Sequence, residues 1–230
     1  MDEMIRIAME AMALELETPA TPFTSAFAQQ GTVTLLVGLD EAPLFVHESY
    51  LTKNSEFFQA AMKKEWVEGQ TRVIKLPEDH LATMTDYLTF TYSSDLPTSK
   101  LIKGAPAQVS GWISLAKLYV LGERLLDRCI RNAIVRELLR ISELPDKNGL
   151  TSFMPVAASN ILFNGTPEWH PIRQMVVDKY VARGGEHWLL AGTENLALLE
   201  VARALLYKVA RRQPYDKFRD RQVKAEDYFV

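Results

Sequence analysis

The sequence predicts an α+β protein in which a small sheet is capped by helices and followed by a mainly helical extension. Three observations support this fold class. Short β-favouring apolar runs gather between residues 32 and 76, where turn residues separate them. From residue 80 onward, apolar residues recur at the three- and four-residue spacing of amphipathic helices. The composition, with 47% hydrophobic and 24% charged residues, is typical of a chain that buries a core.

The strand-forming stretch holds three apolar runs around a short helix. Residues 33–37 and 44–46 are predicted to form two strands joined by a turn, and residues 72–76 a third strand. The turn is expected where residues that favour tight bends gather, at Gly38, Asp40 and Pro43. Ser55 precedes the helix-favouring residues 56–62 as a natural N-cap, because its hydroxyl can accept a hydrogen bond from a free N–H group of the first turn. The local order is therefore strand, strand, helix, strand.

Helices are predicted to follow the sheet. The first covers residues 80–92 and is followed by a loop over residues 93–108 that contains Pro97, Gly104 and Pro106. A strongly helical pattern over residues 109–141 breaks near residues 126–127, which predicts two helices. The residues predicted to face the core here are Leu81, Met84, Leu88, Thr91, Tyr92, Leu115, Leu118, Tyr119, Gly122, Leu125, Leu126, Ile130, Ile134, Leu138 and Ile141.

The remaining chain predicts three more helices. A weaker one covers residues 154–163 and ends in a turn at residues 164–167. The next begins near Pro171 and stops at the two glycines of residues 184–185, and the last follows Thr193. The residues predicted to form the apolar faces of these last two helices are Ile172, Met175, Val176, Tyr180, Leu198, Val201, Ala202, Leu205 and Val209.

Residues 44–68, LFVHESYLTKNSEFFQAAMKKEWVE, resemble the BTB/POZ domain. Members of that family carry an apolar strand that ends in His, then a Leu-x-x-x-Ser-x-x-Phe helix and an acidic turn. The matching positions here are Phe45, Val46, His47, Leu51, Ser55, Phe58, Trp66 and Glu68. Residues 117–135 resemble the helical pair that closes the domain, and residues 161–181 resemble the C-terminal extension of BTB proteins from filamentous fungi.

The resemblance implies a BTB/POZ fold with a small mixed sheet, and it divides the chain into four parts. Residues 1–30 form an acidic leader, in which residues 2–17 favour an amphipathic helix. Residues 31–142 form the BTB/POZ domain, residues 143–212 a helical C-terminal extension, and residues 213–230 a polar tail.

The function that the resemblance implies is a non-enzymatic one, in which the BTB surface mediates self-association or recruits a partner protein. The alternative is a substrate adaptor of a cullin-type ubiquitin ligase, because Trp66-Val67-Glu68 resembles the hydrophobic-x-Glu element that helps some BTB adaptors dock on the cullin scaffold. An exposed aromatic residue beside a carboxylate suits such docking. The competing interpretation is that Trp66 packs back on the domain and Glu68 is solvated.

Two positions depart from the pattern of the dimeric family members. Many of those carry Asp just before the first strand and Lys after the strand-ending His, whereas this chain has Thr32 and Glu48. The change from Lys to Glu reverses a charge near the family's dimer pocket, so a homodimer of the usual kind is an open question. The residues singled out for interaction are Thr32, His47, Glu48, Phe58, Trp66 and Glu68.

Motifs of catalysis or cofactor binding are not found in the sequence. The histidines, His47, His80, His170 and His187, lie far apart and form no metal-spaced pair, and His47 is expected to be a hydrogen-bonded structural residue. Cys129 stands among apolar residues, which favours a buried, inert thiol over a nucleophile. We therefore expect no catalytic site, cofactor or metal, and an enzyme is the least supported class.

Charge and hydropathy set expectations for compartment and partners. The formal net charge of -3 gives no general attraction to nucleic acid, although residues 203–224 are basic; we interpret them as a solvated helix end rather than a nucleic-acid-binding tail. No apolar run approaches the length of a membrane span, and the acidic start is unlike a signal peptide. The nucleus or cytoplasm is expected, so the sequon at Asn164 is interpreted as a turn rather than a glycan acceptor.

Overall fold

The computed structural model describes residues 31–96, 105–143, 154–183, 196–210 and 224–230. These form a three-stranded mixed sheet and a larger set of helices, so the predicted α+β class with a helical majority is confirmed. The strands are β1 (Thr32–Val37), β2 (Ala42–His47) and β3 (Val73–Leu76). The helices are α2 (Glu48–Thr52), α3 (Glu56–Ala61), α4 (Val67–Thr71), α5 (Leu81–Ser93), α6 (Ala105–Arg124), α7 (Arg128–Glu143), α8 (Val156–Gly165), α9 (Pro171–Arg183), α11 (Ala197–Ala210) and the 3-10 turn η2 (Ala225–Tyr228).

The sheet has the order β2-β1-β3, with β1 antiparallel to β2 and parallel to β3. Alternate residues of β1 are buried, and Leu35 pairs with Leu44 on one side and Ile74 on the other. Pro43, which we expected in the turn, is part of β2 and pairs with Leu36. Proline is tolerated there because β2 is an edge strand, so one side of it has no neighbour that needs a ladder hydrogen bond. The turn itself uses the positive φ of Gly38, 76°.

Two short helices, α2 and α4, flank α3 and were not predicted from the sequence. Helix α5 was predicted with nearly correct bounds, but its buried face was wrong in part. Met84 is buried as expected, whereas Leu81 and Tyr92 are 45% and 43% exposed and Tyr87 faces the core instead. Tyr87 faces the core because its hydroxyl donates a hydrogen bond to the buried Asp127.

A buried polar cluster of Ser55 and Asp127 joins the sheet-bearing part to α7. The Ser55 hydroxyl accepts a hydrogen bond from the Phe58 N–H at 3.2 Å, as predicted for an N-cap, and donates to the carbonyl of Leu125 at 2.6 Å. Asp127 Oδ1 accepts hydrogen bonds from the N–H groups of Cys129 and Ile130, at 2.9 and 3.1 Å, so it caps the start of α7. Each cap therefore also fixes the contact between distant helices.

The predicted break between two helices near residues 126–127 is confirmed. Leu126 takes a positive φ of 52° in this turn and is 45% exposed, so its predicted place on the buried face was wrong. Helix α6 begins at Ala105, four residues before the expected start, and Pro106 lies in its first turn. A proline is tolerated there because the first N–H groups of a helix have no partner within the helix.

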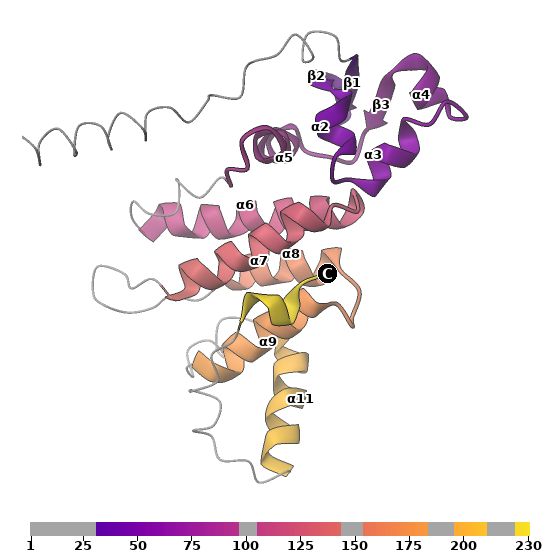
Figure 1. Cartoon of the computed structure of the whole chain (residues 1–230). Helices are drawn as coiled ribbons and strands as arrows, with labels where there is room; N and C mark the ends of the chain where they lie inside the picture. The colour runs from indigo at the N-terminus through magenta and orange to yellow at the C-terminus, as the bar shows by residue number, and fades with distance from the viewer. Residues whose placement is uncertain (1–30, 97–104, 144–153, 184–195, 211–223) are drawn as a thin grey trace, which may run out of the picture.

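The extension packs on α6 and α7, which cross the middle of the molecule (Figure 1). Helix α8 lies so close to α6 that a Cβ on Gly165 would approach the Val120 methyl carbons to 2.4 and 2.5 Å. Asn164 and Gly165 are the last residues of α8, so the turn expected to begin at residue 164 starts later. Helix α9 begins at Pro171 as predicted, and its predicted apolar residues are buried.

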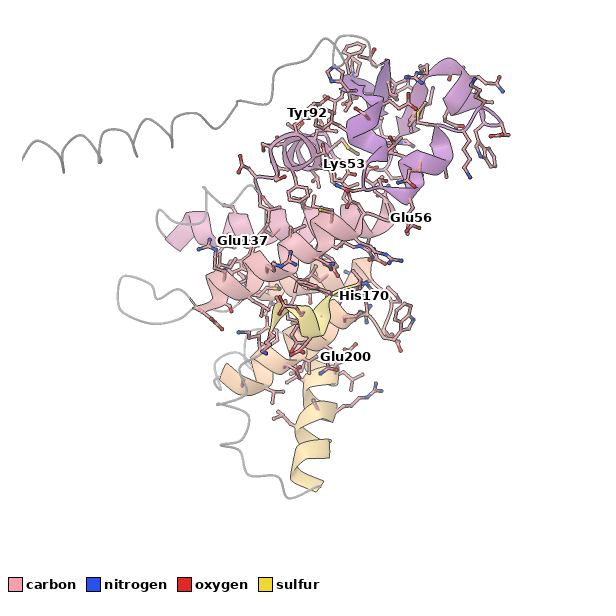
Figure 2. The ribbon with its side chains drawn as sticks, viewed as in Figure 1. Lys53, Glu56, Tyr92, Glu137, His170 and Glu200 are labelled. Atoms are coloured by element: carbon pink, nitrogen blue, oxygen red, sulfur yellow. The ribbon has the colours of Figure 1, made fainter. Side chains whose placement is uncertain are left out.

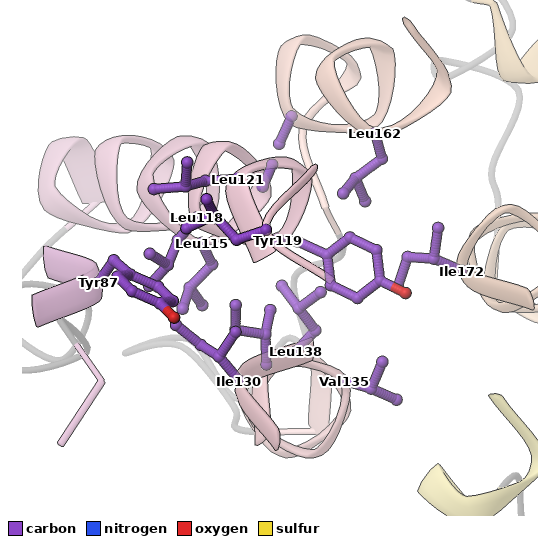
Figure 3. Packing of buried hydrophobic residues seen from close by; sticks show 14 of the residues in the cluster. Tyr87, Leu115, Leu118, Tyr119, Leu121, Ile130, Val135, Leu138, Leu162 and Ile172 are labelled. Atoms are coloured by element: carbon purple, nitrogen blue, oxygen red, sulfur yellow. The ribbon is translucent and has the colours of Figure 1, made fainter. Parts of the chain in front are cut away.

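One continuous hydrophobic core runs from the sheet through α6 and α7 to α9 and α11. Figure 3 shows Tyr119 of α6 extending between α7 and α9 toward Ile172. This side chain therefore joins the core around α6 and α7 to the core of the extension. Several features predicted from the sequence lie outside the described residues. These are the helix of residues 2–17, Pro97, Gly104, residues 184–185, Thr193 and most of the basic stretch.

Candidate interaction surface

Trp66 and Val67 project from the molecule where α4 begins. Trp66 is the N-cap residue of α4 and is 58% exposed, and Val67 is 68% exposed. The interpretation that Trp66 packs back on the domain therefore does not hold. We call Trp66, Val67, Glu68 and the hollow beside them the Trp66 surface.

The hollow of the Trp66 surface is apolar at its floor and charged at its rim. It encloses about 230 Å³ and is lined by Phe57, Ala60, Ala61, Trp66, Glu68, Ile74 and Lys75. Glu68 supplies a half-buried carboxylate, and Lys75 an exposed ammonium group that also pairs with Glu41 at 2.7 Å. An apolar centre with a polar rim is the usual anatomy of a protein-binding surface.

The loop that carries Trp66 is fixed to α4 by close backbone contacts. A Cβ on Gly69 would lie 2.2 Å from the carbonyl oxygen of Lys63, so only glycine allows the loop to approach this closely. The Gln70 side chain donates a hydrogen bond to the carbonyl of Lys64 at 2.9 Å, and the Trp66 N–H donates to Lys63 at 3.0 Å. The backbone that carries Trp66 is therefore held in place before any partner arrives, which lowers the entropic cost of binding.

Glu48 lies on another part of the surface, at the start of α2. Its carboxylate pairs with Arg72 at 2.7 Å, and both side chains are about one third exposed. Its N–H also donates to the carbonyl of Gly31 at 3.1 Å, beside the exposed Thr32. The negative charge that departs from the family pattern thus has a cation within the same chain.

His47 fastens the end of β2 to α5. The Tyr92 hydroxyl lies 3.0 Å from the His47 N–H and 2.9 Å from its Nδ1, and the Tyr50 ring stacks on the Tyr92 ring at 4.2 Å between centroids. The expectation of a hydrogen-bonded structural histidine is confirmed. Phe58, also singled out for interaction, is fully buried and packs near Tyr87, so it supports the fold beneath the surface instead of contacting a partner.

Cys129 differs from the sequence prediction in its exposure. The prediction of a buried thiol was wrong, because Cys129 is exposed beside the α7 N-terminus. Its pKa is raised by partial burial and by the nearby Asp127 carboxylate. A raised pKa leaves little thiolate at neutral pH, which is unlike the electropositive setting of a reactive cysteine.

His170 is buried in the extension (Figure 2), where its Nε2 lies 3.1 Å from Glu123 Oε2. Arg131 also pairs with Glu123, and burial lowers the pKa of His170. The Ile172 N–H reaches the other ring nitrogen at 3.4 Å, so the neutral ring donates from Nε2 to Glu123. This buried trio joins α6, α7 and the start of α9.

Metal ligands do not cluster within the described ranges, where no group of three or more His, Cys, Asp or Glu side chains could hold an ion. Of the other histidines, His80 is exposed before α5 and His187 lies outside those ranges. None of the helices in the described part of the chain is both long and apolar enough to cross a membrane.

Sequence reasoning did not predict the exposure of three apolar side chains. Leu39 in the first turn is 91% exposed, Trp169 before α9 is 80% exposed and Phe45 of β2 is 73% exposed. Phe45 could have been found from strand alternation, because its neighbours in β2, Leu44 and Val46, face the other side of the sheet. Nothing in the local sequence distinguishes Trp169 from a core tryptophan.

A comparison with models of known protein families and a comparison with curated proteins each found no match for this sequence.

Proposed function

We propose that this chain is a BTB/POZ-type protein-interaction module that recruits a partner protein through the Trp66 surface. The observation that supports it most is the exposure of Trp66 and Val67 beside an apolar hollow with charged groups at its rim. Tryptophan is among the residues that most often dominate binding energy at interfaces. An apolar partner side chain would fill the hollow, and a partner cation would face Glu68.

The arrangement of elements supports the family resemblance. Two antiparallel strands, a helical segment that contains the Ser55-capped α3, and a parallel third strand follow the order expected from residues 32–76. The helical pair α6 and α7 then packs beside them, as the resemblance of residues 117–135 implies. The family assignment itself is part of the proposal.

A cullin-type scaffold is the second candidate partner. Trp66 and Glu68 line the same hollow, so the hydrophobic-x-Glu pair can act on one partner at the same time. This arrangement favours scaffold docking over dimerisation through the region of Thr32 and Glu48, where Arg72 already neutralises the glutamate.

The test compares two exposed tryptophans. A photoreactive amino acid in place of Val67 identifies proteins that touch the Trp66 surface, and the affinity of each purified partner is then measured for the wild type and for Trp66→Ala. We expect Trp66→Ala to weaken binding by at least about 30-fold, the size of an interface hot spot. Trp169→Ala, which removes an even more exposed tryptophan from the extension, should leave the affinity unchanged.

Specific outcomes separate the candidate partners. Binding of a recombinant cullin scaffold that falls with both Trp66→Ala and Glu68→Lys favours the adaptor role. Concentration-dependent mass in sedimentation experiments, abolished by Trp66→Ala, favours self-association through the same surface. Equal affinity of the wild type and Trp66→Ala for every captured partner would contradict the proposal.

A further inference from the structure

Residues 224–230 return to the molecule and lie against α7 and α9. They follow the end of α11 at Ala210 across residues that the structure does not describe, and they contain the short turn η2. Figure 1 shows this segment, in yellow, beside α7 and α9. The sequence predicted only a polar tail here, so the contact is a finding of the tertiary structure.

Two aromatic side chains anchor the segment. Tyr228 is only 5% exposed, and its hydroxyl donates a hydrogen bond to Asp178 Oδ2 of α9 at 2.8 Å. Phe229 lies beneath the guanidinium group of Arg136 of α7, 4.4 Å from the ring centroid, which is a cation–π contact. Tyr228 therefore contacts α9, and Phe229 contacts α7.

Asn132 recognises the main chain that follows the aromatic pair. The Val230 N–H donates to Asn132 Oδ1 at 3.1 Å, and Asn132 Nδ2 donates to the main-chain oxygen of Val230 at 3.5 Å. A side-chain amide that reads both the N–H and the C=O of one residue holds an extended peptide whatever its side chain is. Asn132 and Arg136 stand one helical turn apart on α7, so one face of that helix carries both contacts.

The receiving face consists of Asn132, Arg136 and Asp178, and we call it the α7/α9 face. It is preorganised, because the Gln174 side chain donates a hydrogen bond to Asp178 Oδ1 at 2.9 Å, and this leaves Oδ2 for Tyr228. Even with the segment in place, Arg136 is exposed and Asn132 and Asp178 are half-buried. If the segment leaves, water can reach these polar groups, so none of them is left buried without a hydrogen-bond partner.

We propose that the α7/α9 face is a peptide-recognition site for partner segments of the Tyr-Phe-Val type, and that residues 224–230 occupy it as a competing resident. A segment of the same chain has an effective concentration at its site of about a millimolar, so even a weak contact stays mostly closed. A partner segment with the same aromatic pair, followed by one residue whose main chain reaches Asn132, binds when the resident segment leaves. This proposal is independent of the Trp66 surface.

The first test uses a fluorescein-labelled peptide with the sequence of residues 224–230, KAEDYFV, and the full-length chain. The double substitution Tyr228→Ala and Phe229→Ala removes the resident anchors, and we expect this variant to bind the peptide at least 10-fold more tightly than the wild type does. Adding Asn132→Ala or Asp178→Ala to the opened variant should weaken binding at least 10-fold. No binding to the opened variant, or equal binding to it and the wild type, overturns the proposal.

A second measurement needs no substitution and so does not depend on how the variants fold. Hydrogen exchange at residues 225–230 of the wild-type chain is followed with and without millimolar unlabelled KAEDYFV. Displacement of the resident segment should speed exchange at least 10-fold at these amides, while the control peptide KAEDAAV should leave it unchanged. Exchange that KAEDYFV does not alter, or that both peptides alter equally, contradicts competition for the α7/α9 face.

Discussion

The sheet-bearing part of the molecule and the helical extension both bury polar groups, but of different kinds. Around the sheet, the buried Ser55 and Asp127 cap helices over two or three residues of sequence, and the buried Asp79 pairs with Arg124 at 2.9 Å. In the extension, the buried Ser159 and Thr166 donate to nearby carbonyls, but most of the side-chain pairs join long charged or titratable residues that stand far apart in sequence. Arg173 pairs with Glu200, Lys179 with Glu143, and His170 with Glu123.

The difference indicates which contacts specify the structure of each part. A cap satisfies a helix end that must be satisfied in any tertiary context, so the helix start is determined locally. A buried ion pair instead links two helices that find each other only in the folded state, and the loss of one partner strands the other. We therefore expect damage to Ser55 or Asp127 to affect the whole fold, and damage to Arg173 or His170 to loosen the extension first.

The largest effect is expected for Asp127→Ala. It removes the cap of α7 and leaves the Tyr87 hydroxyl without its acceptor, which together should lower the free energy of unfolding by about 3–4 kcal/mol. Urea unfolding measures the change. Asp127→Asn keeps a carbonyl acceptor and should lose only about 1 kcal/mol. Equal losses for the two variants would show that the cap does not carry this stability.

Arg173→Ala should have the next largest effect and should act on the extension. The guanidinium group donates to the carbonyls of Phe163 and Thr166 at the end of α8 and pairs with Glu200 at 3.2 Å. Its removal should cost about 2 kcal/mol, because these carbonyls and the carboxylate lose their partner.

Hydrogen exchange locates the effect of Arg173→Ala. Faster exchange is expected in α8, α9 and α11, with little change in the sheet. Arg140→Ala, which removes an exposed pair with Glu137, is the matched control and should cost less than about 0.5 kcal/mol. Uniform acceleration across the sheet and the extension would mean that the two parts unfold together.

The smallest effect is a pH dependence of the extension through His170. Burial holds the pKa of His170 below its ordinary value of 6.5 in the folded chain, so the unfolded chain binds the proton more readily. The stability contribution is complete above pH 6.5 and is lost as the pH falls below that value. Protection factors in α9, which correct each exchange rate for its intrinsic dependence on pH, should therefore fall between pH 7 and pH 5.5, and His170→Gln should reduce this fall. An unchanged profile in the variant would assign it to other groups.

Much of the sheet-bearing part could be predicted because its signals are local. The Ser55 cap, the strand runs and the break between α6 and α7 depend on neighbouring residues, and all are present. The face of α5 could not be predicted, because Tyr87 is buried through a hydroxyl contact with Asp127, 40 residues away. The exposure of Cys129, by contrast, was predictable, because residue 129 lies off the helix face that Ile130, Ile134 and Leu138 define.

The candidate surface was predictable only in part. Trp66 and Glu68 stood out by their resemblance to a docking element, but their exposure beside one hollow depends on how α3, α4 and β3 pack together. The α7/α9 face could not be predicted at all, because Asn132 and Val230 are 98 residues apart.

The sequence by itself determined the α+β class, most of the helix and strand positions and the Ser55 cap, because periodicity and capping depend on residues within one or two turns of each other. Only the tertiary structure decided that Glu48 is neutralised by Arg72, that Glu123 serves both His170 and Arg131, and that residues 224–230 settle on α7 and α9. These contacts join side chains from separate elements, and their geometry exists only once the shared hydrophobic core has brought those elements together.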